Sequence, residues 1–290
     1  MVLLIALIAI GVFMMTTQNY FCKNLFTNKS DNFAYSLILY VIAMLTTFFM
    51  NGAVIRSFSA FTCIDGIIYG LMMLFELICT LQAYKNGPMS LTTLFTVASV
   101  MIPIIPAWIF WGDPVTWQQV SGIIVMFIAA ALILNVGSEF KKEKINIKWF
   151  LYALGAFICS GIAGINEKLI TVSGNEAQSN EFILIGFAAG SAAMIIALLL
   201  STKKEPVTIR FNTRIAVPTL VIGICTCLVS VITMAVLAVL PASVVFTVNN
   251  GARLILVTLI DVIFFKEKIT GSQYAGLGLG IIGVALLSLS

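Results

Sequence analysis

The chain has 290 residues, of which 60% are hydrophobic and only 10% are charged. Soluble domains average about 25% charged residues, and a soluble fold of this length would need a polar surface to cover so much apolar area. The composition therefore excludes an ordinary soluble protein and predicts an integral membrane protein in contact with the lipid bilayer. The net charge of +4 is small and scattered, so we expect no nucleic-acid partner.

Apolar runs long enough to cross about 30 Å of hydrocarbon recur along the whole chain. We expect transmembrane helices over residues 2–18, 32–50, 61–83, 88–111, 117–136, 149–171, 182–201, 215–237, 241–265 and 273–289. No basic region precedes the first run and no cleavage site follows it, so it predicts a retained helix and not a signal peptide. The fold class that follows is an all-α integral membrane protein with ten transmembrane helices.

Two stretches of the chain, 87–122 and 241–276, follow the same pattern of an apolar run, an acidic turn and the start of another apolar run. The matching pairs are Asp113 with Glu267, Thr116 with Thr270, Gln119 with Gln273, and Gly122 with Gly276. The strongest hydrophilic break lies between the two stretches. We therefore predict a five-helix repeat over 1–136, a charged linker over 137–148 and a second repeat over 149–290. Because five is odd, the second repeat enters the bilayer from the opposite side, as in many secondary transporters.

The acidic turn at Glu267 with Thr270 and Gly276, and its weaker copy at Asp113, resemble the ends of EamA-type modules of the drug/metabolite transporter superfamily. The resemblance covers nearly the whole chain. It implies ten helices in two inverted five-helix repeats. It also implies transport of small metabolites, often export.

Ionisable residues inside apolar helices give the strongest functional signal, because charge is costly in hydrocarbon and is usually functional there. Glu76 lies within the third predicted helix and Arg253 near the middle of the ninth. Asn249 and Asn250 precede Arg253 by four and three residues and share its helix face. We expect Arg253 to hold a carboxylate or phosphate, and Glu76 to bind an amine or take up a proton. The alternative is that Glu76 and Arg253 pair with each other for structural reasons.

The fourth predicted helix carries a polar stripe and two prolines. Thr92, Thr96 and Ser99 lie on one side of it, where their hydroxyls would contact substrate or bond to neighbouring helices. Pro103 and Pro106 predict a bend in this helix. The bend would either act as a hinge or gate for transport or be a static feature of the helix. The matching positions of the second half carry no proline.

Three functional classes follow from these residues. The first is a secondary transporter that uses no ATP and works by alternating access. Its expected substrate is a small polar or amphipathic metabolite, with amino-acid-like compounds favoured, and export is favoured over uptake. An exchanger of phosphorylated or nucleotide-sugar-like anions is the alternative. A membrane enzyme acting on lipid-linked substrates is disfavoured, because the chain has no histidine and no P-loop or H-E-x-x-H motif. The third class, a non-transporting scaffold, would gain nothing from polar groups buried in helices.

The expected partners are a small-molecule substrate, the lipid bilayer and a coupling proton or counter-substrate, with no cofactor and no metal. The chain would lie in the cell membrane as a monomer or homodimer. Most of the 16 Lys and Arg residues fall on the side opposite the termini, so the positive-inside rule places the termini outside. The family resemblance favours termini inside.

Overall fold

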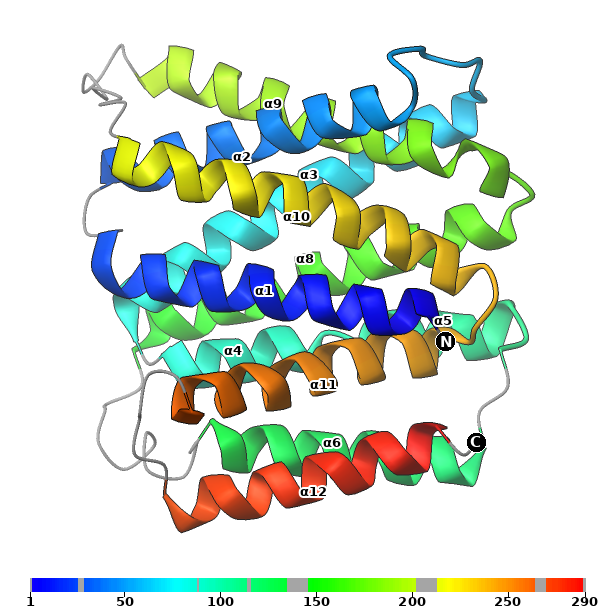
Figure 1. Ribbon diagram of the computed structural model, residues 1–290. Helices are drawn as coiled ribbons and strands as arrows, with labels where there is room; N and C mark the ends of the chain where they lie inside the picture. The colour runs from blue at the N-terminus through cyan, green and yellow to red at the C-terminus, as the bar shows by residue number, and fades with distance from the viewer. Residues whose placement is uncertain are drawn as a thin grey trace.

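The chain forms a bundle of long helices that run back and forth along one direction (Figure 1). The computed structural model describes residues 2–25, 29–87, 89–113, 116–134, 146–201, 213–263 and 270–288. Within these ranges there is no strand. The helices are α1 (Val2–Leu25), α2 (Lys29–Met50), α3 (Ala60–Asn86), α4 (Met89–Ala98), α5 (Met101–Phe110), α6 (Trp117–Ile133), α8 (Ile147–Val172), η1 (Glu176–Gln178), α9 (Ser179–Ser201), α10 (Thr213–Leu237), α11 (Ala242–Ile263) and α12 (Gly271–Ser288).

The all-helical, membrane-spanning fold class is confirmed for the described part of the chain. In that part, 6 helical stretches are long and apolar enough to cross a membrane: Ala60–Asn86, Leu91–Phe110, Ile147–Val172, Glu176–Ala197, Ala216–Leu237 and Ala242–Ile260. The remaining helices contain the shorter apolar stretches Val2–Met14, Tyr35–Met50, Trp117–Ile133 and Gly271–Leu286. Ten transmembrane helices and an inverted repeat therefore stay predictions. Most of the predicted linker, residues 137–145, lies outside the described residues, and α8 already begins at Ile147.

The predicted fourth helix is broken into α4 and α5 at residues 99 and 100. Proline has no backbone N–H, and its ring crowds the carbonyl four residues earlier. Pro103 therefore cannot donate to the carbonyl of Ser99, which instead accepts a bond of 3.0 Å from the N–H of Ile102. The predicted bend is confirmed as a break one turn before Pro103. Pro106 lies inside α5.

Matching caps begin α6 and α12. The Thr116 hydroxyl accepts from the Gln119 N–H, while Gln119 Oε1 accepts from the Thr116 N–H, both at 3.2 Å. At α12, Gln273 Oε1 accepts from the Thr270 N–H at 2.9 Å. The Thr-x-x-Gln pattern thus forms a full capping box at α6, and at α12 the glutamine side chain makes the matching bond to the backbone N–H of the capping threonine. Figure 1 shows that α6 and α12 lie side by side and run in opposite directions.

Helices from the two halves of the chain pack directly on each other. Helix α3 lies against α8 and α9, helix α10 lies against α1 and α2, and α6 lies against α12. A buried aromatic cluster between α2, α3 and α9 contains Tyr40, Tyr69, Phe182 and Phe187. Its rings meet in edge and tilted contacts, with centroids 5.9 Å apart for Tyr40 and Phe187 and 4.9 Å for Tyr69 and Phe182. The core therefore depends on contacts between the halves.

The closest approach of α3 to α9 occurs at Gly70. A Cβ added there would overlap the carbonyl group of Gly186. We expect Gly70→Ala to destabilise the protein by about 1–3 kcal/mol, the usual cost of overpacking. Thermal unfolding of the purified protein in detergent measures the change.

Gly278→Ala is the matched control, because an added Cβ at Gly278 in α12 meets nothing within 4 Å. Alanine is favoured over glycine in a helix by about 1 kcal/mol, so this variant should be as stable as the parent or more so. Equal melting temperatures for the two variants would contradict the α3–α9 contact.

Candidate functional site

A cavity lies between α3, α5, α8, α10 and α11, with the α4–α5 break at its wall. We call it the central cavity; it has about 580 Å³ of empty space. Its polar lining consists of Ser99, Ser160, Glu167, Thr233, Asn249 and Asn250. Both halves of the chain supply polar side chains to it. An apolar lining with a few converging polar groups is typical of a small-molecule site.

Glu167 is the one carboxylate among the described residues that line the central cavity. Its Oε1 accepts a hydrogen bond of 3.1 Å from the hydroxyl of Tyr69, and the hydroxyls of Tyr69 and Ser230 lie 3.2 Å apart. Tyr69 is fully buried, so this bond fixes the carboxylate against α3. The hydroxyls of Ser99 and Ser160, which also line the cavity, lie 2.9 Å apart. The arrangement offers a held negative charge and several hydrogen-bonding groups.

Glu76 lines a second cavity, which we call the side cavity, with about 480 Å³ of empty space. Its other polar lining residues are Tyr35, Tyr40 and Thr226. Met73 of α3 lines both cavities, so they are neighbours. The Thr80 hydroxyl, one turn further along α3, donates to Glu76 Oε1 at 3.1 Å. The structure therefore places Glu76 at a cavity wall next to the central cavity.

The other predicted site residues lie in different places. Asn249, Asn250, Ser99 and Pro103 line the central cavity. The Thr92 hydroxyl accepts a bond of 2.8 Å from the Trp149 indole and is fully buried.

The Thr96 hydroxyl donates to the Thr93 carbonyl at 2.9 Å, and neither Thr92 nor Thr96 lines either cavity. The backbone of Arg253 continues α11, but its side chain lies outside the described part of the structure. The pairing of Glu76 with Arg253 stays untested for that reason.

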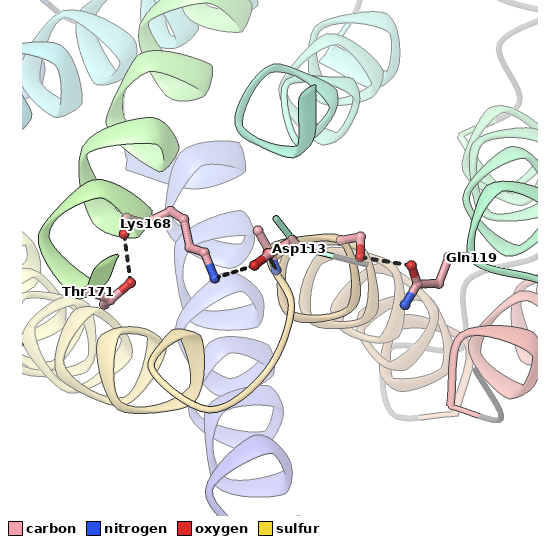
Figure 2. A network of polar contacts seen from close by, with 6 residues as sticks. Asp113, Gln119, Lys168 and Thr171 are labelled. Carbon is pink, nitrogen blue, oxygen red and sulfur yellow. Dashed lines mark hydrogen bonds and ion pairs between the residues drawn. The ribbon is translucent and has the colours of Figure 1, made fainter. Parts of the chain in front are cut away.

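One end of the bundle is joined by a buried ion pair between the halves. Lys168 Nζ on α8 lies 3.0 Å from Asp113 Oδ1, and the two side chains are only 5% and 13% exposed. Asp113 Oδ2 also accepts from the Ala242 N–H at 2.7 Å, at the start of α11. Figure 2 shows Lys168 reaching from its helix to Asp113, with Gln119 beyond it. A carboxylate at the N-terminus of a helix is favourable.

More hydrogen bonds between the halves lie at the same end, where the 51–59 segment faces the start of α9. Asn51 Nδ2 donates to Glu181 Oε1 at 3.1 Å. Gln178 Oε1 accepts from the Ser59 N–H at 2.8 Å and from the Thr62 hydroxyl at 2.7 Å. Together with the ion pair, these contacts fasten this end of the bundle. We call it the fastened end.

The sequence alone did not identify Glu167 and Lys168 as candidate site residues, although both lie within the predicted helix over 149–171. In the structure α8 ends at Val172, and its packing against α3 and α5 places both residues inside the bundle. The signal that would have found them is the polar triplet Asn166–Lys168 followed by the apolar run LITV. A triplet flanked by apolar residues on both sides belongs within a span. Among the described residues, no group of three or more His, Cys, Asp or Glu is placed to hold a metal.

Comparison with known proteins identifies the second half of the chain. A family model described as the EamA-like transporter family matches residues 147–289, starting at the first residue of α8. These residues belong to the EamA-like transporter family. The resemblance to the drug/metabolite transporter superfamily is thereby confirmed. EamA-like proteins are membrane transporters of small molecules and not enzymes, so this multi-pass protein is assigned to that broad class.

Solved structures share the fold of this chain. A chain titled "Crystal structure of protein" has a TM-score of 0.72 to this chain and 14% sequence identity, and the alignment covers 98% of each. At that identity the likeness shows the fold alone. No curated protein matches the chain significantly.

Proposed function

We propose that the protein is a secondary transporter in the cell membrane that carries a small metabolite bearing an amine, such as an amino-acid-like zwitterion, by alternating access. The observation that carries the proposal is the central cavity, with one carboxylate, two carboxamides and three hydroxyls. A substrate ammonium group would pair with Glu167 through a charge-assisted hydrogen bond. The carboxamides of Asn249 and Asn250 would hold the polar remainder of the substrate.

The pairing of helices supports a transporter built from two inverted repeats. Helix α8 packs on α3 as α1 packs on α10, and α9 packs on α3 as α2 packs on α10. Helices α6 and α12 pack on each other. This is the pattern expected if residues 1–136 and 149–290 are two copies related by a twofold axis. In such transporters the substrate site lies near the bilayer midplane at the repeat interface.

The positions of the cavities support one direction of access. The side cavity is lined by the early part of α2, by Glu76 and Leu77 beyond the middle of α3, and by the first half of α10. It therefore lies on the side of the bundle away from the fastened end. Basic residues gather in the loops at that side, which the positive-inside rule places in the cytoplasm. We propose that this conformation receives substrate from the cytoplasm and that export is the main direction.

Filling the central cavity tests the proposal. Val229 of α10 lines it, and we expect Val229→Phe to reduce flux of amino acids and amines into proteoliposomes by at least about tenfold, because even 1.4 kcal/mol of lost binding is tenfold. Val217→Phe is the matched control on the same helix, where Val217 is 62% exposed, and it should leave flux unchanged. Full flux in Val229→Phe would exclude this cavity.

The same assay separates the substrate classes. Labelled L-serine, L-lysine, putrescine and glucose 6-phosphate serve as probes. Flux of the sugar phosphate alone, lost in Arg253→Ala, would favour the anion exchanger over the amine carrier.

A further inference from the structure

A second buried carboxylate lies in α3, one turn before Tyr69. Asp65 is only 5% exposed. Its Oδ2 is buried and has no hydrogen-bond partner. In the amide orientation that satisfies both neighbours, Asn166 donates to Asp65 Oδ1 at 3.2 Å and accepts from the Tyr69 N–H at 3.2 Å. A buried polar atom without a partner requires an explanation.

The simplest role for an acidic residue this early in a helix is a favourable charge at the helix N-terminus. The structure does not support it, because Asp65 is the sixth residue of α3 and Ser59 already caps that helix. The effect of the helix dipole falls off within the first turn. An ionised carboxylate with one oxygen bonded only to a neutral amide and the other to nothing is strongly disfavoured in a buried site. Burying the neutral acid costs far less free energy than burying the carboxylate, so this environment favours the protonated form of Asp65.

The charged groups around Asp65 are accounted for. Helix α3 packs there on α8 and α9. From α8, the Lys168 ammonium is bound to Asp113 and Glu167 is bound to Tyr69. From α9, Glu181 accepts from Asn51. Among the described residues, no cation pairs with Asp65, and the nearest acidic neighbour along the network is Glu167.

Asp65 and the cavity carboxylate are connected through adjacent residues of two packed helices. Asn166 and Glu167 are consecutive on α8, and their partners Asp65 and Tyr69 are one turn apart on α3. An ionised Glu167 repels a second negative charge at Asp65. A substrate ammonium at Glu167 would neutralise that repulsion and permit Asp65 to ionise.

We infer that Asp65 is the proton-binding site of this transporter, and that an amine binding at Glu167 is exchanged for the proton of Asp65. The inference rests on the proposed function of the central cavity. A substrate with one net positive charge, such as L-lysine, brings in one charge as one proton leaves, so the net charge of the site is unchanged; a zwitterion such as L-serine brings no net charge, so its exchange moves one positive charge across the membrane with the proton. The proton passes to the aqueous phase at the fastened end once that end opens, since Asp65 lies near it.

Transport by Asp65→Asn in phosphatidylcholine vesicles tests the coupling, with L-serine, L-lysine and putrescine as probes. For one-for-one exchange, a gradient of about one pH unit drives an accumulation of about tenfold. We expect Asp65→Asn to lose this accumulation while still exchanging labelled for unlabelled probe. Glu176→Gln is the control, because Glu176 is an exposed residue of η1. It should keep both the pH-driven accumulation and the exchange of labelled for unlabelled probe. Full pH-driven accumulation in Asp65→Asn, or its replacement by a sodium-driven one, would overturn the inference.

Infrared difference spectra of the vesicles after a pH step test the site without any substrate. The wild type should show the C=O stretch of a protonated carboxylic acid that disappears at high pH, and Asp65→Asn should lack it. An unchanged band in Asp65→Asn would overturn the inference. A lost band together with full flux in Val229→Phe would instead reject the central cavity and leave the proton site standing.

Discussion

Asp113→Asn is expected to be among the most destabilising single substitutions in this protein. The side chain of its partner Lys168 is 5% exposed, and removing one member of a buried ion pair costs about 3–5 kcal/mol because the other charge stays buried alone. Asparagine keeps an oxygen that can accept from the Ala242 N–H, so the cap of α11 survives. The measurement is the melting temperature of the purified protein. A fall of roughly 10 °C is expected, given about 2–4 °C per kcal/mol for chains of 150–250 residues.

A double-mutant cycle isolates the ion pair. Lys168→Met keeps the length of the side chain without its charge and leaves Asp113 unpaired, so it should also destabilise. The double variant has no buried charge and should be more stable than the sum of the two single effects predicts, with a coupling energy within the usual range of about 0.5–3 kcal/mol. Glu176→Gln removes a charge from the surface of the same end and should change stability by less than about 0.5 kcal/mol. If the stability changes of the two single variants simply add in the double variant, the ion pair between Asp113 and Lys168 is contradicted.

The double variant also tests the role of the fastened end in alternating access. With the ion pair gone, the halves are still joined there by hydrogen bonds, among them those of Gln178 and Glu181. We expect the conformation open at this end to gain population. With Thr62→Cys added, the cysteine should then react faster with a membrane-impermeant maleimide than it does in the protein that keeps the ion pair.

The sequence predicted the general architecture because it depends on local patterns. Apolar length predicted the helices, and the repeated Thr-x-x-Gln pattern indicated the repeat, with each copy falling at the start of α6 or α12. The lack of an N–H at Pro103 predicted a bend in the fourth helix. These features need only the chain within a few residues of each position.

The composition of the site was less predictable, because it depends on which helices meet. Ser99 and Asn249 lie at the central cavity, but Thr92 of the same polar stripe is bonded to Trp149. The residue types alone do not distinguish the two hydroxyls; the difference comes from the packing of α8. The sequence did not identify Glu167 and Asp65 as site residues for the same reason, since their burial is created by contacts between the halves.

Glu167→Gln is expected to abolish transport of amine substrates. A hydrogen bond between charged groups contributes about 1.5–3 kcal/mol, so the loss in affinity is on the order of tenfold to a hundredfold. The substitution keeps the size of the side chain and an oxygen that can accept from Tyr69, so the fold should be preserved. Binding is measured as the shift in melting temperature caused by L-lysine or putrescine, and transport as flux into vesicles.

Glu76→Gln separates the central cavity from the side cavity. Glu76 accepts only from Thr80 among the described residues, and its cavity adjoins the central one at Met73. If the substrate ammonium binds at Glu167 and only passes Glu76, Glu76→Gln should slow flux and leave the ligand-induced shift in melting temperature unchanged. Glu167→Gln should remove both. The reverse result, with the shift lost in Glu76→Gln and kept in Glu167→Gln, would move the binding site into the side cavity, where a single carboxylate among two tyrosines and a threonine would have to hold the amine.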